Sequence, residues 1–231
     1  MQNNSVKSEF TCQYCHKSFK RERTIESHAC EPRRRFRAKN EKPTQIAFII
    51  FQQFYKFSQH SAKIKTFDDF IKSPYYGAMI KFGQYCINTK VLNPQRYGTY
   101  LIKQEIPIDK WNKDSVYQDF ILNLIKVEPV EDALTRSILY SIEWGEGHNE
   151  EAHNFFREAT PTRISQAIEY GRISPWILYL SESGNQFLES LHSQEQTRIW
   201  NMIDPTFWTD KFDANKEDVD FVKLTLKKGG W

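Results

Sequence analysis

The 231-residue sequence has no long hydrophobic run. No segment approaches the roughly 18 consecutive apolar residues that a membrane-spanning helix needs. The N-terminal residues MQNNSVKSEF also lack the apolar centre of a secretory signal peptide. From these absences we expect no membrane association and a cytoplasmic protein.

Motifs that mark common enzyme classes are missing as well. The chain has no phosphate-binding glycine loop, no nucleophile elbow and no paired-carboxylate signature on a strand. The nearest approach is the acidic segment 143–153, where Glu150 and His153 have the three-residue offset of carboxylate-bridged di-iron bundles. Such a site needs a second pair, and Gly145 and Gly147 indicate a loop. We therefore predict an exposed acidic loop and no catalytic residue.

Cysteine is scarce, because the chain has only four and three of them lie between Cys12 and Cys30. A reducing compartment favours thiolate ligation of a metal over disulfide bonds in such a cluster. Cys86 stands alone, and we expect it to be a small core residue.

Four residues near the N-terminus have the spacing of a zinc site. Cys12 and Cys15 are separated by two residues, and His28 and Cys30 follow after a gap of twelve. Cysteine thiolates and histidine imidazoles are the usual ligands of tetrahedral structural zinc. We therefore predict zinc as the cofactor, with Cys12, Cys15, His28 and Cys30 as its ligands.

Apolar residues lie around these four positions. Phe10 comes just before the first cysteine, Phe19 follows the second, and Ile25 comes three residues before His28. With these residues, the segment 10–31 resembles a single zinc finger of the two-Cys-two-His type. The resemblance implies a small ββα fold whose stability depends on the metal.

The last ligand departs from the pattern of that family, which leaves three to five residues between the final pair. Only Ala29 separates His28 from Cys30. Residues two apart on a helix point about 200° from each other. The helix must therefore unwind just after His28 if Cys30 is to reach the ion. Pro32 favours this, because a proline disfavours helix at the residue before it, Glu31.

Positive charge is concentrated at the same end of the chain. Residues 1–42 hold 11 Lys and Arg against 5 Glu, whereas the remainder holds 21 basic and 24 acidic residues. A basic end on a nearly neutral body indicates that any contact with nucleic acid is made there. The candidate residues are the cations of the finger and of the run PRRRFRAK, with two helix positions that face bases in DNA-reading fingers: Lys17, Lys20, Arg21, Arg23, Thr24, Ser27, Arg33, Arg34, Arg35, Arg37 and Lys39.

One finger covers about 3 base pairs, too few for a specific site. We therefore expect binding to DNA or RNA that is independent of sequence and sensitive to salt. Phe36, inside the basic run, is suited to stack on a base or to anchor the run to the body. Glu22 and Glu26 on the same short helix would repel phosphate.

The remaining chain has apolar residues at helical spacing, which predicts a mainly α protein: a small ββα zinc finger followed by a larger helical domain. We expect a finger module at residues 1–31, a basic linker or arm at 32–42 and a helical body at 43–231. Predicted helices cover 46–57, 66–71, 75–88, 94–102, 114–127, 130–144, 161–168 and 175–180, with an aromatic turn at 205–208 and a last helix or short strand at 219–226.

A wider resemblance rests on short phrases. The runs CEPRRR and NEKPTQIAFIIFQQFYKF, and GRISPW at 171–176, resemble uncharacterised finger-bearing proteins of large tailed bacteriophages related to the T-even group. This resemblance implies a protein of the host cytoplasm that acts in phage DNA replication, recombination or transcription.

Three hypotheses for function remain open at this point. The first is a non-enzymatic accessory protein whose finger and arm contact DNA or RNA while the helical body binds a partner protein. The second is a docking adaptor, in which Glu22, Ile25, Glu26 and Phe36 face a protein. The third is a metal-dependent nuclease whose carboxylates converge only in the folded body.

Overall fold

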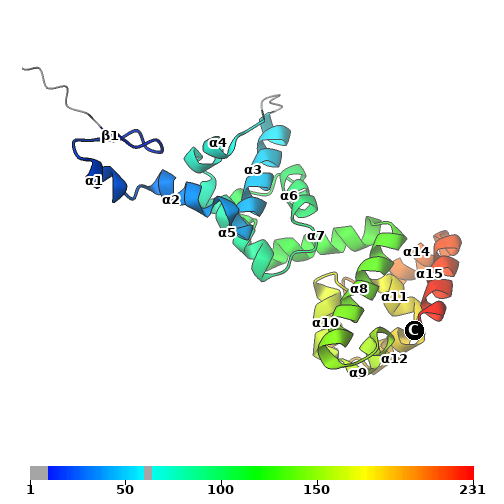
Figure 1. Cartoon of the computed structure of the whole chain (residues 1–231). Coiled ribbons are helices and arrows are strands. Elements are labelled where there is room, and N and C mark those ends of the chain that lie inside the picture. Colours follow the sequence, from blue (N-terminus) through cyan, green and yellow to red (C-terminus); the bar gives the residue numbers. More distant parts are fainter. Residues whose placement is uncertain (1–9, 60–63) are drawn as a thin grey trace, which may run out of the picture. The chain divides into compact units, whose positions relative to one another are not determined.

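The structure is a computed structural model that describes residues 10–59 and 64–231. Within these ranges the chain forms fifteen α-helices and one two-stranded antiparallel sheet at its N-terminal end. The predicted fold class, a small ββα element followed by a helical body, is confirmed. The chain divides into two compact units, Met1–Asn112 and Lys113–Trp231 (Figure 1). The boundaries expected at residues 31 and 42 stay predictions.

The first unit contains the sheet and the helices that follow it. Its elements in chain order are β1 (Phe10–Thr11), β2 (Ser18–Phe19), α1 (Glu22–Glu26), α2 (Glu31–Arg37), the 3-10 turn η1 (Ala38–Asn40), α3 (Lys42–Gln59), α4 (Phe67–Lys72), α5 (Tyr76–Asn88), α6 (Pro94–Lys103) and the 3-10 turn η2 (Ile108–Lys110).

Helix α3 is the centre of this unit and packs against both α5 and α6. Two glycines allow the close approach. A Cβ on Gly83 of α5 would lie 2.2 Å from the carbonyl oxygen of Pro43, and one on Gly98 of α6 would lie 2.6 Å from the side chain of Ile50. Larger residues would therefore push the helices apart. The core behind them is aromatic and includes the fully buried Trp111.

The start of α4 follows the sequence prediction. The Thr66 hydroxyl accepts a hydrogen bond from the Asp69 amide at 3.2 Å, and the Asp69 carboxylate accepts from the Thr66 amide at 2.8 Å. This reciprocal pair is a capping box with Asp in place of the more usual Glu.

The second unit is helical throughout. Its elements are α7 (Asp114–Val127), α8 (Val130–His148), the 3-10 turn η3 (Ala152–Asn154), α9 (Phe155–Glu158), α10 (Pro161–Glu169), α11 (Pro175–Leu180), α12 (Glu182–Ser190), α13 (Ser193–Ile199), α14 (Pro205–Ala214) and α15 (Lys216–Lys228).

Helix α11 forms the core of the second unit, where it contacts α8, α12 and α15 (Figure 1). Its residues Pro175 to Leu178 are all buried. Trp176 packs edge-on against Trp208 at 6.1 Å and against Phe212 at 5.0 Å between ring centroids. Such aromatic pairs contribute beyond the area they bury, by about 0.5–1.5 kcal/mol each.

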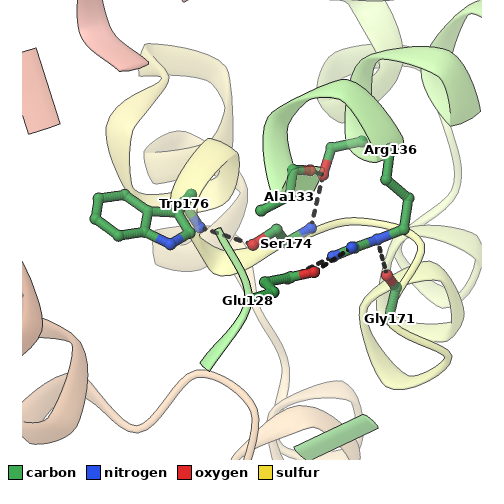
Figure 2. A network of polar contacts seen from close by, with 7 residues as sticks. Glu128, Ala133, Arg136, Gly171, Ser174 and Trp176 are labelled. Atoms are coloured by element: carbon green, nitrogen blue, oxygen red, sulfur yellow. Dashed lines mark hydrogen bonds and ion pairs between the residues drawn. The ribbon is translucent and has the colours of Figure 1, made fainter. Parts of the chain in front are cut away.

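A network of hydrogen bonds around a buried ion pair connects α8 to the segment before α11 (Figure 2). The Arg136 guanidinium binds both carboxylate oxygens of Glu128, one of them at 2.7 Å, and donates from Nε to the Gly171 carbonyl at 2.6 Å. The Glu128 side chain is only 1% exposed. Nearby, the Ser137 hydroxyl accepts from the Ser174 amide at 2.9 Å. These contacts fix the turn that carries Gly171.

Two predictions for this part of the chain are wrong. The segment expected as an acidic loop is helical up to His148, since α8 continues four residues beyond Trp144 and ends where Asn149 adopts a left-handed conformation. The expected turn at 205–208 is the start of α14. Asp204 caps it by accepting from the amide of Thr206 at 3.0 Å, and proline is tolerated in a first turn.

No helix in the described part of the chain is both long enough and apolar enough to cross a membrane.

Candidate metal centre and basic surface

The β1–β2 hairpin positions the first two cysteines. Phe10 pairs with Phe19 across the sheet, and the turn between the strands is closed by hydrogen bonds from the Cys12 amide to the Lys17 carbonyl at 2.9 Å and from the His16 amide to the Cys12 carbonyl at 2.8 Å. His16 has a φ of 58°, in the left-handed region that a tight turn requires. Cys12 and Cys15 are thereby held on a short, well-defined loop.

Helix α1 delivers the other two ligands by ending early. It begins after Arg21 and stops at Glu26, so that His28 and Cys30 both lie outside it. The unwinding that the spacing demanded therefore occurs before His28 rather than after it. Cys30 is extended, with φ −101° and ψ 157°.

The prediction that Pro32 would disfavour helix at Glu31 is wrong. Helix α2 begins at Glu31 and has Pro32 in its first turn. A proline is tolerated there because the amides of a first helical turn have no intrahelical partner. The extended residue is the N-cap Cys30, one position earlier than the sequence predicted.

The four predicted ligands come together. One ligand atom from each of Cys12, Cys15, His28 and Cys30 lies within 4.8 Å of the others. The Cys12 and Cys30 sulfurs are 3.9 Å apart, and the Cys15 sulfur is 3.2 Å from Nε2 of His28. A tetrahedron with zinc–sulfur bonds of about 2.3 Å has edges of about 3.8 Å. These four residues can therefore hold a metal ion.

The thiols of the hairpin differ in acidity. The Cys15 amide donates to the Cys12 sulfur and is the main reason that the pKa of Cys12 is lowered. At Cys15 the Lys17 amide acts to lower the pKa, but burial and the neighbouring Cys12 and Cys30 sulfurs raise it overall. Since metals bind the thiolate, protons compete with a metal at this site, and its affinity must fall as the pH falls.

The apolar residues around the cluster form a very small core. Phe10, Phe19 and Ile25 are each half-buried, and the Phe19 ring lies 4.6 Å from the His28 ring. Between residues 10 and 41, Cys12 is the only buried residue. So little burial cannot fix a fold on its own, and a metal bound by the four ligands would be the main source of stability for this segment.

The basic run expected as a linker or arm forms helix α2, and two of its arginines bond to backbone carbonyls outside that helix. The Arg33 guanidinium donates to the His28 carbonyl at 2.6 Å and to carbonyls at the C-terminal end of α1. The Arg35 guanidinium donates to the Ile71 carbonyl at 2.7 Å and lies 4.4 Å from the Tyr76 ring. These groups join α2 to the metal-binding segment on one side and to the helices after it on the other.

Phe36 has the anchoring role that was one of its two predicted roles. It is half-buried, and its ring lies 5.1 Å from Tyr14 and 6.1 Å from Phe67. These contacts leave the ring poorly placed to stack on a base or to face a partner protein.

The remaining nine candidate residues for nucleic-acid contact are exposed. Arg34 pairs with Glu31 at 2.7 Å, and the Lys39 amine lies 5.5 Å from the Phe67 ring. Glu22 and Glu26 are exposed on α1 beside them. Nucleic-acid contact stays a prediction for all eleven residues; the exposed ones are Lys17, Lys20, Arg21, Arg23, Thr24, Ser27, Arg34, Arg37 and Lys39.

The acidic segment after Trp144 does not form a metal cluster. Among the residues that the structure describes, the Cys12 cluster is the only group of three or more such side chains that meets. His148 bonds the Trp144 carbonyl at 2.7 Å, and Glu150 accepts from Asn154 at 3.1 Å. Both side chains therefore have local structural contacts.

Protein-family models, curated proteins and solved structures were compared with the chain, and none of them matches. The resemblance to bacteriophage proteins therefore stays a prediction, and the site rests on its own geometry.

Proposed function

We propose that this is a zinc-binding, non-enzymatic accessory protein that contacts DNA or RNA through the exposed cations of its metal-binding segment and α2. The observation that carries the proposal is the four-ligand cluster, whose atoms lie within 4.8 Å of one another. Its donor set, three thiolates and one imidazole, is typical of structural zinc and leaves no open position for catalysis.

The basic surface supports the second half of the proposal. Arg33 and Arg35 bond to backbone carbonyls on either side of α2 and so join the metal-binding segment to the rest of the unit. The exposed Arg34 and Arg37 are thereby presented from an ordered helix. Cations on an ordered helix lose less conformational freedom when they bind a polyanion than cations on a flexible linker do.

Two measurements test the proposal. Native mass spectrometry should show one zinc ion per chain, which is lost in the variant Cys30→Ser. Fluorescence anisotropy with labelled single- and double-stranded oligonucleotides should show affinity that falls steeply with salt and varies little with sequence.

Charge reversal tests whether the exposed cations of α2 contact the oligonucleotide. In Arg34→Glu/Arg37→Glu the slope of log K against log salt should become less negative by at least about 1.4, the value for two lost phosphate contacts. The matched control Lys223→Glu/Lys227→Glu makes the same charge change on exposed residues of α15 and should leave the slope nearly unchanged. Equal losses in both variants, or no affinity for either oligonucleotide at low salt, would refute nucleic-acid binding.

A further inference from the structure

A second group of cations lies in the unit Lys113–Trp231, far along the sequence from the basic N-terminal end. A hollow of about 200 Å³ opens between α8 and α10, and we call it the α8/α10 hollow. Two arginines, two tyrosines and a glutamine line it, and none of its lining residues is acidic: Tyr140, Arg163, Gln166, Ala167, Tyr170 and Arg172.

Most of this lining comes from one face of α10. Arg163, Gln166, Ala167 and Tyr170 follow the three- and four-residue spacing that aligns side chains on a helix. Beside this face, Ile164 and Ile168 of α10 are buried in the core, so α10 cannot rotate without exposing those residues. The polar groups of the hollow are thereby held in a fixed direction.

The other arginine is positioned by the buried network of Figure 2. Gly171 adopts a φ of 69°, and the Arg172 amide that follows donates to the Ala167 carbonyl at 2.7 Å. The Gly171 carbonyl is held in turn by Arg136, which is paired with the buried Glu128 (Figure 2). A turn fixed in this way holds the backbone of Arg172 in place, which is part of the support that a binding residue needs.

Aromatic rings complete the hollow. The Arg172 guanidinium lies 5.8 Å from the centre of the Tyr140 ring, and that ring also packs edge-to-face with Phe155 at 5.6 Å between centroids. The Tyr170 ring stacks on Tyr117 at 6.3 Å. The side chains of Tyr140 and Tyr170 are half-buried. Each of these two rings therefore packs on a neighbouring aromatic ring and keeps part of its surface exposed.

The carboxylate at the end of α10, Glu169, is held by other groups. Glu169 accepts from Gln118 at 2.7 Å and lies 3.7 Å from the Arg198 guanidinium. These partners reduce its repulsion of an anion in the hollow.

We infer that the α8/α10 hollow binds the phosphate group of a nucleotide, with Arg163 and Arg172 on its oxygens and a tyrosine ring against the base. Paired guanidinium groups match phosphate geometry, and bases stack on aromatic rings. Ligand pockets for whole small molecules are about 300–1,000 Å³. The smaller hollow suits one phosphate and part of a base, with the sugar left in solvent. This site is separate from the N-terminal surface and does not depend on the proposed function.

The experiment uses the full metal-bound chain labelled with ¹⁵N-arginine and follows the Nε–Hε signals by NMR. Titration with AMP should shift the signals of Arg163 and Arg172 in a saturable way. Inorganic phosphate should bind more weakly, and adenosine weaker still. Each of Arg163→Gln and Arg172→Gln should weaken AMP binding by about tenfold or more, because each removes a charge-assisted hydrogen bond. The control Arg157→Gln removes an exposed arginine outside the hollow and should bind AMP normally.

A 5′-phosphorylated hexathymidylate then distinguishes a nucleic-acid strand from a free nucleotide as the source of the phosphate. Repeating the titration in Arg34→Glu/Arg37→Glu separates the two proposals, since AMP binding should persist there even if oligonucleotide binding is lost. The inference is overturned if AMP causes no saturable shift, or if Arg157 responds as strongly as Arg163. Equal affinity for AMP and inorganic phosphate would overturn the contact with the base.

Discussion

In the segment from Phe10 to Cys30 only Cys12 is buried, whereas the unit Lys113–Trp231 encloses Trp176 and Trp208 with less than 2% of either exposed. The two regions therefore obtain their stability by different means. The first has four ligand atoms that a metal can join, and the second has a continuous apolar core with a buried ion pair. Each region should respond to a treatment that leaves the other intact.

Metal removal should have the largest effect. A chelator should unfold residues 10–30, since about 10–16 kcal/mol of metal binding is coupled to folding in such modules. The helical signal in circular dichroism should persist. Cys12, Cys15 and Cys30 should become reactive to iodoacetamide. Cys86 should stay protected, because burial raises the pKa of its thiol to about 12.

The variant Cys86→Ala serves as the control for this labelling and should still show three chelator-dependent modifications. If the metal-free chain keeps its N-terminal NMR signals and its thiols stay unreactive, the first region does not depend on metal for its fold.

Breaking the buried ion pair should have the next largest effect, and only on the second unit. Arg136→Met leaves the buried Glu128 carboxylate without its partner, which costs about 3–5 kcal/mol. Lys216→Met is the matched control. It breaks a pair with Asp213 whose side chains are 70% and 66% exposed, and exposed pairs contribute about 0–1 kcal/mol. Urea unfolding followed by tryptophan fluorescence measures both, and equal losses would contradict the burial argument.

Local signals explain why so much of the fold could be predicted from the sequence. The bounds of α7 were predicted to the residue, because Pro129 and the apolar spacing mark them. The spacing of the four ligands predicted the metal cluster in the same way. Errors arose where a local preference was overruled: α8 runs through Gly145 although glycine is a poor helix former, and the lack of a Cβ there lets the Glu150 carbonyl pack against the helix. A Cβ there would lie 2.4 Å from that oxygen.

Features that depend on tertiary structure could not be predicted. The inward contacts of Arg33 and Arg35 depend on carbonyls that become available only once α1 ends and α4 packs. The α8/α10 hollow joins Tyr140 to Arg163 and Arg172, which are more than twenty residues away in the chain. No spacing rule links such positions, because their proximity follows from helix packing alone.

Removal of a helix cap should have a smaller effect on stability, and one that differs between the two units. Thr66→Ala removes the hydroxyl half of a capping box in the first unit, together with the hydroxyl's own hydrogen bond to the Asp69 carboxylate at 2.9 Å, and should cost about 1 kcal/mol. Thr160→Ala in the second unit removes a single long hydrogen bond of 3.3 Å from the Arg163 amide and should cost less. Paired urea titrations compare them, and a larger loss for Thr160→Ala would show that cap geometry does not set the difference.

The smallest expected effect concerns pH, where the two regions should respond in opposite directions. Acid weakens metal binding by the first region, because protons compete for its thiolates. In the second unit, burial raises the pKa of Glu169 and Asp114 adds to this, although Arg198 and Gln118 oppose it. The folded state then holds more protons than the unfolded state between the ordinary pKa of Glu and the raised one, so this residue lowers stability as the pH rises through that window.

Glu169→Gln should therefore gain stability relative to the parent chain from pH 4 to pH 7, by less than about 0.5 kcal/mol because solvent screens the group. Urea titrations across this range, with Glu217→Gln as an exposed control, test the sign. A relative loss for Glu169→Gln would mean that the Arg198 contact outweighs burial.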